Sequence, residues 1–84
     1  MKITFKLYAT LSDYLPLEAR ARSGFEVEVE AGTTPLDLIE RYALPIKLCH
    51  LVLINGSYVE PALRAKRALA EGDVVAIWPP IAGG

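Results

Sequence analysis

One stretch of this chain has the pattern of a regular helix, and the other periodic stretches alternate as strands do, so the helix is expected to pack on a sheet. In TTPLDLIERYAL, Thr34 is suited to be the N-cap and Pro35 the first helical residue, where a missing N–H costs no hydrogen bond. Asp37 follows three positions after the cap, close to a capping box. We expect the main helix over about 34–43. Its core-facing stripe should consist of Leu36, Ile39 and Ala43.

Two strands are expected before the helix, because apolar and polar side chains alternate there with a period of two. The residues expected to face the core are Ile3, Phe5 and Leu7 in the first strand and Phe25, Val27 and Val29 in the second. Three glutamates alternate with the second set, which puts the other face of that strand in water. Between the strands, one helical turn can form before Pro16, and the stretch 18–23 is expected to be a mobile loop.

The second half of the chain contains a hairpin and a final strand. LVLI at 51–54 is apolar throughout, so this strand is expected to be covered on both faces. Asn55 and Gly56 both tolerate the positive φ angles of a tight hairpin turn, which leads to a short return strand over 57–59. The last strand spans 74–78. Strands on both sides of one helix, without a repeating βαβ pattern, predict an α+β domain.

Composition limits the partners and the compartment. A chain of 84 residues forms one domain with a modest core, and its formal net charge of −1 does not favour nucleic acid as a partner. No apolar run approaches the roughly 20 residues of a membrane helix, so no membrane partner is expected. Cys49 is the only cysteine, which favours a buried, inert thiol and a reducing, cytoplasmic location. The cluster Arg64, Lys66 and Arg67 is interpreted as a solvated loop.

The end of the chain is a tail that can deliver a single chemical group. Pro79 and Pro80 lack N–H donors and favour an extended chain, so the sheet must end before them. We expect 1–78 to form the body and 79–84 an extended, flexible tail. The tail residues after the prolines are Ile81, Ala82, Gly83 and Gly84. Glycines would let the tip enter a narrow tunnel in a partner enzyme, where it presents the carboxylate of Gly84.

A carboxylate must be activated before it reacts, most simply as an acyl-adenylate made with ATP, after which a nucleophile can take the acyl group. On this interpretation the body supplies no catalytic side chain. His50 has no Cys, Asp or Glu at metal-ligand spacing, so no metal site is expected. The alternative is that the two glycines are only a frayed end.

The tail and the last two strands resemble a known family. IWPPIAGG resembles the C-terminus of the ubiquitin-like sulfur carriers (MoaD/ThiS), above all the small subunit of molybdopterin synthase. LVLINGSYV and ALAEGDVVAIWPP resemble the last hairpin and the last strand of that family. The resemblance implies a ubiquitin-like β-grasp fold, in which one mixed four- to five-stranded sheet wraps around one main helix.

The resemblance also implies a function and partners. An adenylyltransferase related to ubiquitin-activating enzymes would adenylate Gly84 with ATP, and sulfur transfer would then make a thiocarboxylate. The large subunit of molybdopterin synthase would use that sulfur in molybdenum or tungsten cofactor biosynthesis. The protein would bind no cofactor itself and would act as a cosubstrate or small subunit. Three alternatives stay open: a thiamine-type or other sulfur carrier, a ubiquitin-like modifier conjugated through Gly84, and a non-reactive interaction module.

Strand parity predicts a docking face on the outer side of the sheet. If the apolar residues of each strand face the core, their aromatic neighbours Tyr8, Tyr58 and Trp78 must face outward. Large exposed aromatic residues mark partner sites, and the resemblance implies that these positions contact both the activating enzyme and the large subunit. The alternative is that they only cover the sheet edge.

Overall fold

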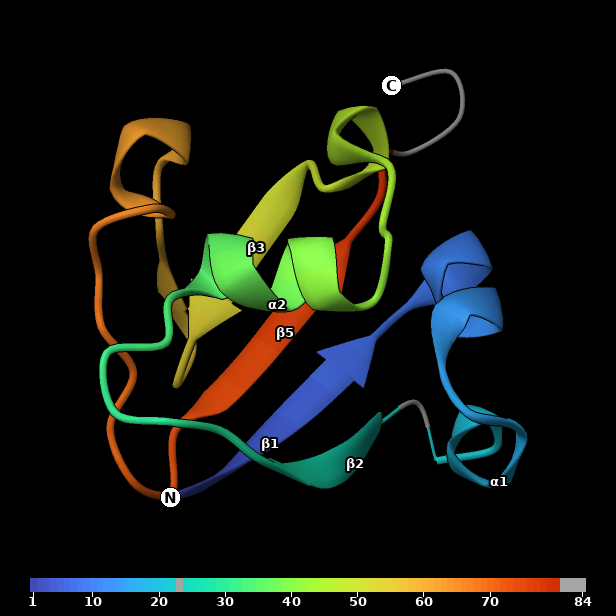
Figure 1. Ribbon diagram of the computed structural model, residues 1–84. Helices are drawn as coiled ribbons and strands as arrows, with labels where there is room; N and C mark the ends of the chain where they lie inside the picture. Colours follow the sequence, from blue (N-terminus) through green and yellow to red (C-terminus); the bar gives the residue numbers. More distant parts are fainter. Residues whose placement is uncertain (23, 81–84) are drawn as a thin grey trace.

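The computed structural model describes residues 1–22 and 24–80, and in these residues five strands form one mixed sheet with a helix across one face (Figure 1). The order of the strands across the sheet is β2-β1-β5-β3-β4. Their bounds are Lys2–Leu7 (β1), Gly24–Glu28 (β2), Leu51–Ile54 (β3), Ser57–Tyr58 (β4) and Val74–Trp78 (β5). β1 and β5 are parallel, and the other three pairs are antiparallel. The predicted α+β class is confirmed.

The main helix, α2 (Pro35–Arg41), begins as predicted and ends earlier. The Thr34 hydroxyl accepts from the Asp37 N–H at 3.3 Å, and the Asp37 carboxylate accepts from the Thr34 N–H at 2.9 Å, so the capping box is complete. Ala43 has a φ of 56°, and the Leu44 N–H donates to the Ile39 carbonyl at 2.9 Å. This left-handed residue reverses the chain at the helix end.

The reversal corrects the predicted core stripe of the helix. Ala43 is exposed, because it lies after the helix, and Leu36 is only half-buried. Leu38 and Ile39 are the buried aliphatic residues of α2, and Tyr42 packs partly against the core. The two-turn helix therefore presents an adjacent pair of side chains to the sheet rather than a stripe extending to Ala43.

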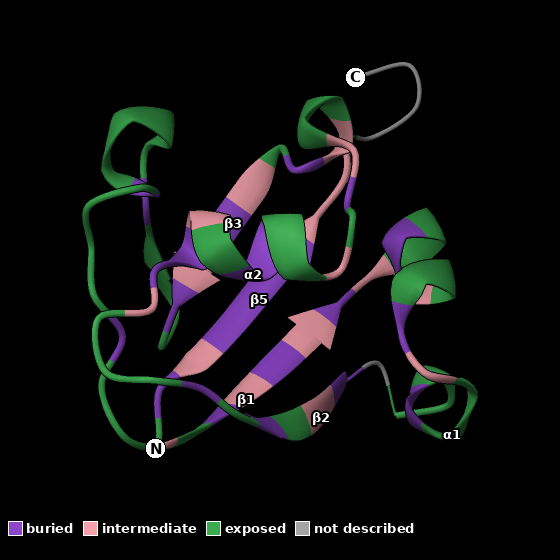
Figure 2. Ribbon diagram, in the orientation of Figure 1, coloured by how far each residue is buried: buried purple, intermediate pink, exposed green. Residues whose placement is uncertain are grey.

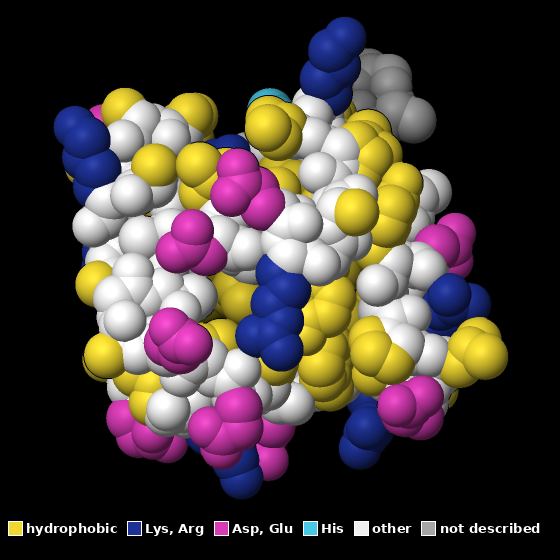
Figure 3. Space-filling model, viewed as in Figure 1, with side chains coloured by type: hydrophobic (Ala, Val, Ile, Leu, Met, Phe, Trp, Pro, Cys, Tyr) yellow, Lys and Arg dark blue, Asp and Glu magenta, His cyan; other side chains and the backbone are white. Residues whose placement is uncertain are grey.

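The hydrophobic core lies between α2 and the facing side of the sheet (Figure 2). The residues predicted to face inward on β1 are all buried, and on β5 and β3 the buried side chains include Val52, Ile54, Val75 and Ile77. Phe5 is fully buried, and its ring lies 6.5 Å from Phe25 and 5.2 Å from Tyr42 between centroids. Figure 3 shows hydrophobic side chains reaching the surface beside α2, where this small core is incompletely covered.

Residues 18–20 are helical, which corrects the prediction of a mobile loop over 18–23. A 3-10 helix, η1 (Ala9–Tyr14), is followed by a one-turn helix, α1 (Leu17–Arg20). Ala19 is fully buried, and the Arg20 guanidinium donates to the Leu15 carbonyl at 3.1 Å and to the Asp13 carbonyl at 2.8 Å. The burial of Ala19 and these short-range hydrogen bonds of Arg20 order a segment that lacks helical periodicity. Ser23 lies outside the described residues. Two further 3-10 turns are η2 (Ile46–Leu48) and η3 (Pro61–Leu63).

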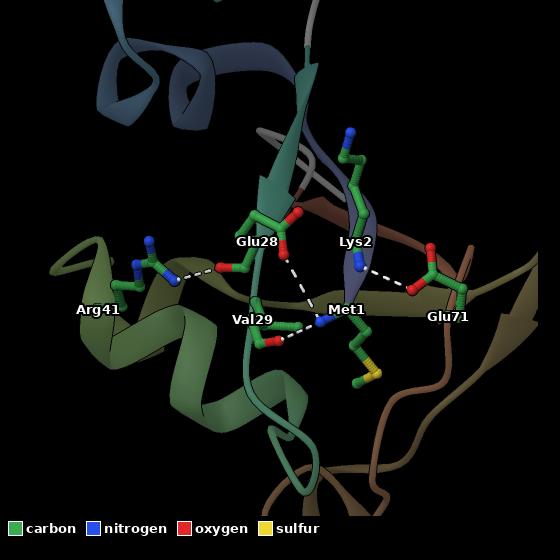
Figure 4. A network of polar contacts seen from close by, with 6 residues as sticks. All are labelled: Met1, Lys2, Glu28, Val29, Arg41 and Glu71. Carbon is green, nitrogen blue, oxygen red and sulfur yellow. Dashed lines mark hydrogen bonds and ion pairs between the residues drawn. The ribbon is translucent and has the colours of Figure 1, made fainter.

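Polar contacts join the start of the chain to its neighbours (Figure 4). The Met1 amine donates to the Val29 carbonyl at 2.9 Å and lies 3.6 Å from the Glu28 carboxylate. The Arg41 guanidinium donates to the Glu28 carbonyl at 3.1 Å, and the Lys2 N–H donates to the Glu71 carboxylate at 3.0 Å. These bonds connect β2 to the last turn of α2 and β1 to the turn before β5.

Gly24→Ala should destabilise the domain by about 1–3 kcal/mol, as overpacking does in a filled site. A Cβ atom at Gly24 would lie 2.5 Å from the Phe5 carbonyl oxygen and 2.9 Å from the Lys6 Cα, and backbone atoms cannot move aside as side-chain ends can. Urea denaturation followed by circular dichroism measures the change. An unchanged midpoint would show that β1 and β2 can separate locally without cost.

Candidate functional site

The candidate site is the end of β5, where the chain leaves the sheet. The Tyr8 N–H donates to the Ile77 carbonyl at 3.1 Å on one side, and the His50 N–H donates to the Trp78 carbonyl at 3.1 Å on the other. Pro79 is half-buried and Pro80 is exposed, and neither can donate a backbone hydrogen bond. The strand therefore stops at Trp78. The predicted tail residues Ile81, Ala82, Gly83 and Gly84 lie outside the described residues, and their roles stay predictions.

Two of the three predicted docking aromatics meet at this point. The rings of Tyr8 and Trp78 are stacked, with centroids 4.2 Å apart and planes at 3°. Both side chains are half-buried, so the stacked pair lies at the surface of the protein and not in its core. Tyr58 lies on the edge strand β4 and is 56% exposed. The structure places all three on the surface, and their role in partner binding stays a prediction.

Strand register joins these aromatics through residues that the sequence analysis missed. Leu51 lies opposite Trp78, while Leu53 lies opposite Ala76 on one side and Tyr58 on the other. Opposite residues of paired strands point to the same face of a sheet. We call this surface the outer apolar patch; it consists of Tyr8, Leu51, Leu53, Tyr58 and Trp78, and Ala76 on the same face is buried.

The outer apolar patch corrects the prediction that β3 is covered on both faces. Val52 and Ile54 are buried on the core side, whereas Leu51 and Leu53 are only half-buried. The unbroken apolar run LVLI indicated burial but did not show which face of β3 is covered. The pairing of Leu51 with Trp78 and of Leu53 with Tyr58 places both leucines on the outer face, and that pairing is known only once the strand register is known.

Within residues 1–22 and 24–80, no three His, Cys, Asp or Glu residues come close enough to hold a metal ion. Nor does any helix in this part of the chain have the length and apolar character to cross a membrane. A concavity of about 520 Å³ opens beside β1 and β2, and opposite charges line it: Lys6 and Arg22 with Glu18 and Glu26.

Cys49 is buried, as predicted, and its thiol contacts the Pro45 carbonyl at 3.5 Å. Burial raises the pKa of the Cys49 thiol, and the nearby Arg64 guanidinium counteracts part of that rise. The folded state therefore favours the protonated thiol. The contribution of the protonated Cys49 thiol to the free energy of unfolding is complete below the unfolded pKa of about 8.5. This contribution is lost as the pH rises toward the higher folded pKa.

We expect Cys49 to react with a thiol-specific disulfide reagent at pH 8 at least about tenfold more slowly in the native protein than in urea, because the thiolate is the reactive form. Absorbance of the released chromophore measures the rate. Equal rates in the two states would mean that this segment opens freely, contrary to its burial.

Arg64 corrects the interpretation of the basic cluster. Lys66 and Arg67 are exposed, as a solvated loop requires, but Arg64 is only 8% exposed. Its guanidinium donates to three backbone carbonyls, those of Val59, Cys49 and His50, at 3.0, 2.7 and 3.1 Å. Spacing along the sequence does not distinguish Arg64 from its two neighbours.

A mixed five-stranded sheet with parallel central strands, one covering helix and a chain that leaves from the end of β5 defines a ubiquitin-like β-grasp protein. SAMP1 from Haloferax volcanii matches over 100% of both chains, at 22% identity and a TM-score of 0.68. The HVO 2177 protein of the same organism matches 100% of this chain with 87% of its own, at 25% identity and a TM-score of 0.74.

A chain from the complex of subunits 1 and 2 of molybdopterin-converting factor from Helicobacter pylori also matches over 100% of both chains, at 15% identity and a TM-score of 0.59. No sequence among the curated proteins gives a significant match. The model of the ThiS family matches residues 14–84. The chain belongs to the ThiS family. It has the ubiquitin-like fold of the ThiS/MoaD type.

Proposed function

We propose that this protein carries sulfur as a thiocarboxylate on Gly84. The Gly84 carboxylate would attack the α-phosphate of ATP in the site of an activating enzyme, releasing pyrophosphate and forming an acyl-adenylate. A sulfur nucleophile would then attack the carbonyl carbon and displace AMP. One observation supports this most strongly: in a member of the ThiS family, β5 is held from both sides up to Trp78 and continues into Pro79 and Pro80, which cannot extend the sheet.

In this scheme the partners bind the body of the protein and supply the catalytic groups. The activating enzyme consumes the ATP, and ATP supply favours the cytoplasm as the place of reaction. The outer apolar patch borders the base of the tail, so a partner that binds the patch also receives the tail. The stacked pair of Tyr8 and Trp78 gives the end of that surface nearest the tail a large aromatic anchor, of the kind common in protein interfaces.

We further propose the large subunit of a molybdopterin synthase as the acceptor of the sulfur. The double proline of IWPPIAGG favours this branch, and the Helicobacter pylori chain with the same fold belongs to a complex of subunits 1 and 2 of molybdopterin-converting factor. Thiamine-type sulfur transfer remains the alternative acceptor pathway within the family.

A modifier function is the second candidate. The chain matches Haloferax volcanii SAMP1, which is a small archaeal modifier protein, along its full length. An acyl-adenylate at Gly84 would serve either reaction, and the acceptor would be a protein lysine instead of a sulfur nucleophile. Covalent adducts in extracts of the source cells that disappear when Gly84 is deleted would favour conjugation. A non-reactive module predicts instead that deleting the tail leaves partner binding intact.

Intact mass spectrometry tests the proposal. The untagged full chain is incubated with ATP, sulfide and its host's activating enzyme, and fragmentation then locates any modification. We expect a mass gain equal to replacing one oxygen by sulfur, located at Gly84. No gain with a matched enzyme that adenylates its usual carrier would overturn the proposal.

Trp78→Ala should weaken binding to the activating enzyme by roughly 30-fold, which corresponds to about 2 kcal/mol for a central interface aromatic. The substitution removes the larger ring of the stacked pair, next to the base of the tail. Isothermal titration calorimetry gives the dissociation constant. Tyr14→Ala is the matched control, because Tyr14 is an exposed aromatic outside the patch. Equal losses in both variants would show that the patch is not the docking face.

A further inference from the structure

Arg64 is an unusual residue to bury in a domain of this size. A guanidinium loses its hydration on burial, and the loss is large unless each donor finds an acceptor. Here the Nε, Nη1 and Nη2 groups each donate to a carbonyl. No carboxylate in the described part of the chain forms an ion pair with Arg64. The residue is therefore held entirely by the backbone around it.

The carbonyls bound by Arg64 come from the two segments on either side of the β3–β4 hairpin. Val59 follows β4, whereas Cys49 and His50 immediately precede β3. Arginine suits this place because its planar fork directs several N–H groups at fixed angles, which the single ammonium of lysine cannot do. Arg64 thus fixes the position of the Cys49–His50 peptide relative to the hairpin.

The same peptide segment holds the base of the tail. The His50 carbonyl accepts from Arg64 at 3.1 Å, while the His50 N–H donates to the Trp78 carbonyl at 3.1 Å. On the other side of this end of β5, the Tyr8 N–H donates to the Ile77 carbonyl at 3.1 Å. Pro79 and Pro80 add no donor of their own. The direction in which the tail leaves the sheet therefore depends on His50, and through it on Arg64.

We propose that Arg64 is a positioning residue that sets the exit direction of the tail, so that Gly84 reaches the reacting atoms in the activating enzyme. This inference rests on the proposed function. The hydrogen bonds of the Arg64 guanidinium go to Val59, Cys49 and His50, none of which belongs to the outer apolar patch, so its loss should slow the reaction of bound carrier more than it weakens binding. If the tail leaves the sheet in another direction, Gly84 is no longer in position to react, and this lowers kcat.

The test compares Arg64→Met and Arg64→Lys with the matched control Arg67→Met, which removes an exposed guanidinium from the same cluster. Each variant is assayed at a temperature where its thermal melt shows it fully folded. For Arg64→Met we expect kcat of thiocarboxylate formation to fall at least about tenfold and KM for the carrier to change less than about threefold. Arg64→Lys should be intermediate and Arg67→Met unchanged.

Amide hydrogen exchange provides a readout that does not depend on sulfur transfer. Exchange of the His50 amide should accelerate at least about tenfold in Arg64→Met, while the Tyr8 amide on the opposite side of β5 keeps its protection. Wild-type kcat in a folded Arg64 variant would overturn the inference, as would unchanged His50 protection. If wild-type protein gains no sulfur, the proposed function fails, and the exchange rates alone decide whether Arg64 holds the tail base. If Arg64→Met does not fold, Arg64→Lys carries both measurements.

Discussion

Deleting Gly84, or adding one alanine after it, should lower ATP-dependent thiocarboxylate formation at least about 100-fold while leaving the free energy of unfolding unchanged. One residue moves the terminal carboxylate by up to about 3.5 Å along an extended tail, and a shift of about 1 Å already costs that factor in a positioned reaction. The body is unaffected, because the last residue of the described hydrophobic core is Ile77. Intact mass after incubation with the activating enzyme measures the reaction, and urea denaturation measures stability.

Ile81→Val is the control for this pair of variants, since it alters the tail without changing its length. It should keep most of the wild-type rate. A chain with one extra residue that accepted sulfur as fast as the wild type would contradict the proposed role of Gly84, because a tunnel-bound carboxylate cannot tolerate that shift.

Phe5→Ala should remove about 3–5 kcal/mol of stability, which is a large share of the roughly 5–15 kcal/mol typical of a whole domain. Phe5 is fully buried on the central strand β1, and its ring packs against Phe25 at 6.5 Å and Tyr42 at 5.2 Å. Removal of the ring leaves a cavity between the sheet and the end of α2. Urea denaturation at constant pH gives the change in the free energy of unfolding.

Phe25→Ala is the matched control, because Phe25 belongs to the same aromatic cluster but is only half-buried. Its loss should be clearly smaller than that of Phe5→Ala. A loss below about 1 kcal/mol for Phe5→Ala would mean that neighbouring side chains refill the site, contrary to the close packing expected of a core.

Local patterns predicted the parts of the fold that depend on near neighbours. The capping box of Thr34 and Asp37 forms because its partners are three residues apart. The hairpin turn forms at Asn55 and Gly56, whose φ angles are 51° and 85°. Alternation placed β1 and β2 correctly, because one buried face imposes a period of two on any strand.

Local patterns failed where the deciding contact is distant in the sequence. The exposure of Leu51 and Leu53 follows from which strands pair and which face α2 covers. No window of a few residues contains that information.

The sequence by itself determined the family and the tail that carries its proposed chemistry, because IWPPIAGG and the strand order are continuous or near-neighbour features. It also placed the aromatic residues on the outer side of the sheet by parity. Only the tertiary structure brought Tyr8 onto Trp78 and connected Arg64 to the base of the tail through His50. Those residues are 70 and 14 positions apart, and only the folded sheet brings such groups within bonding distance.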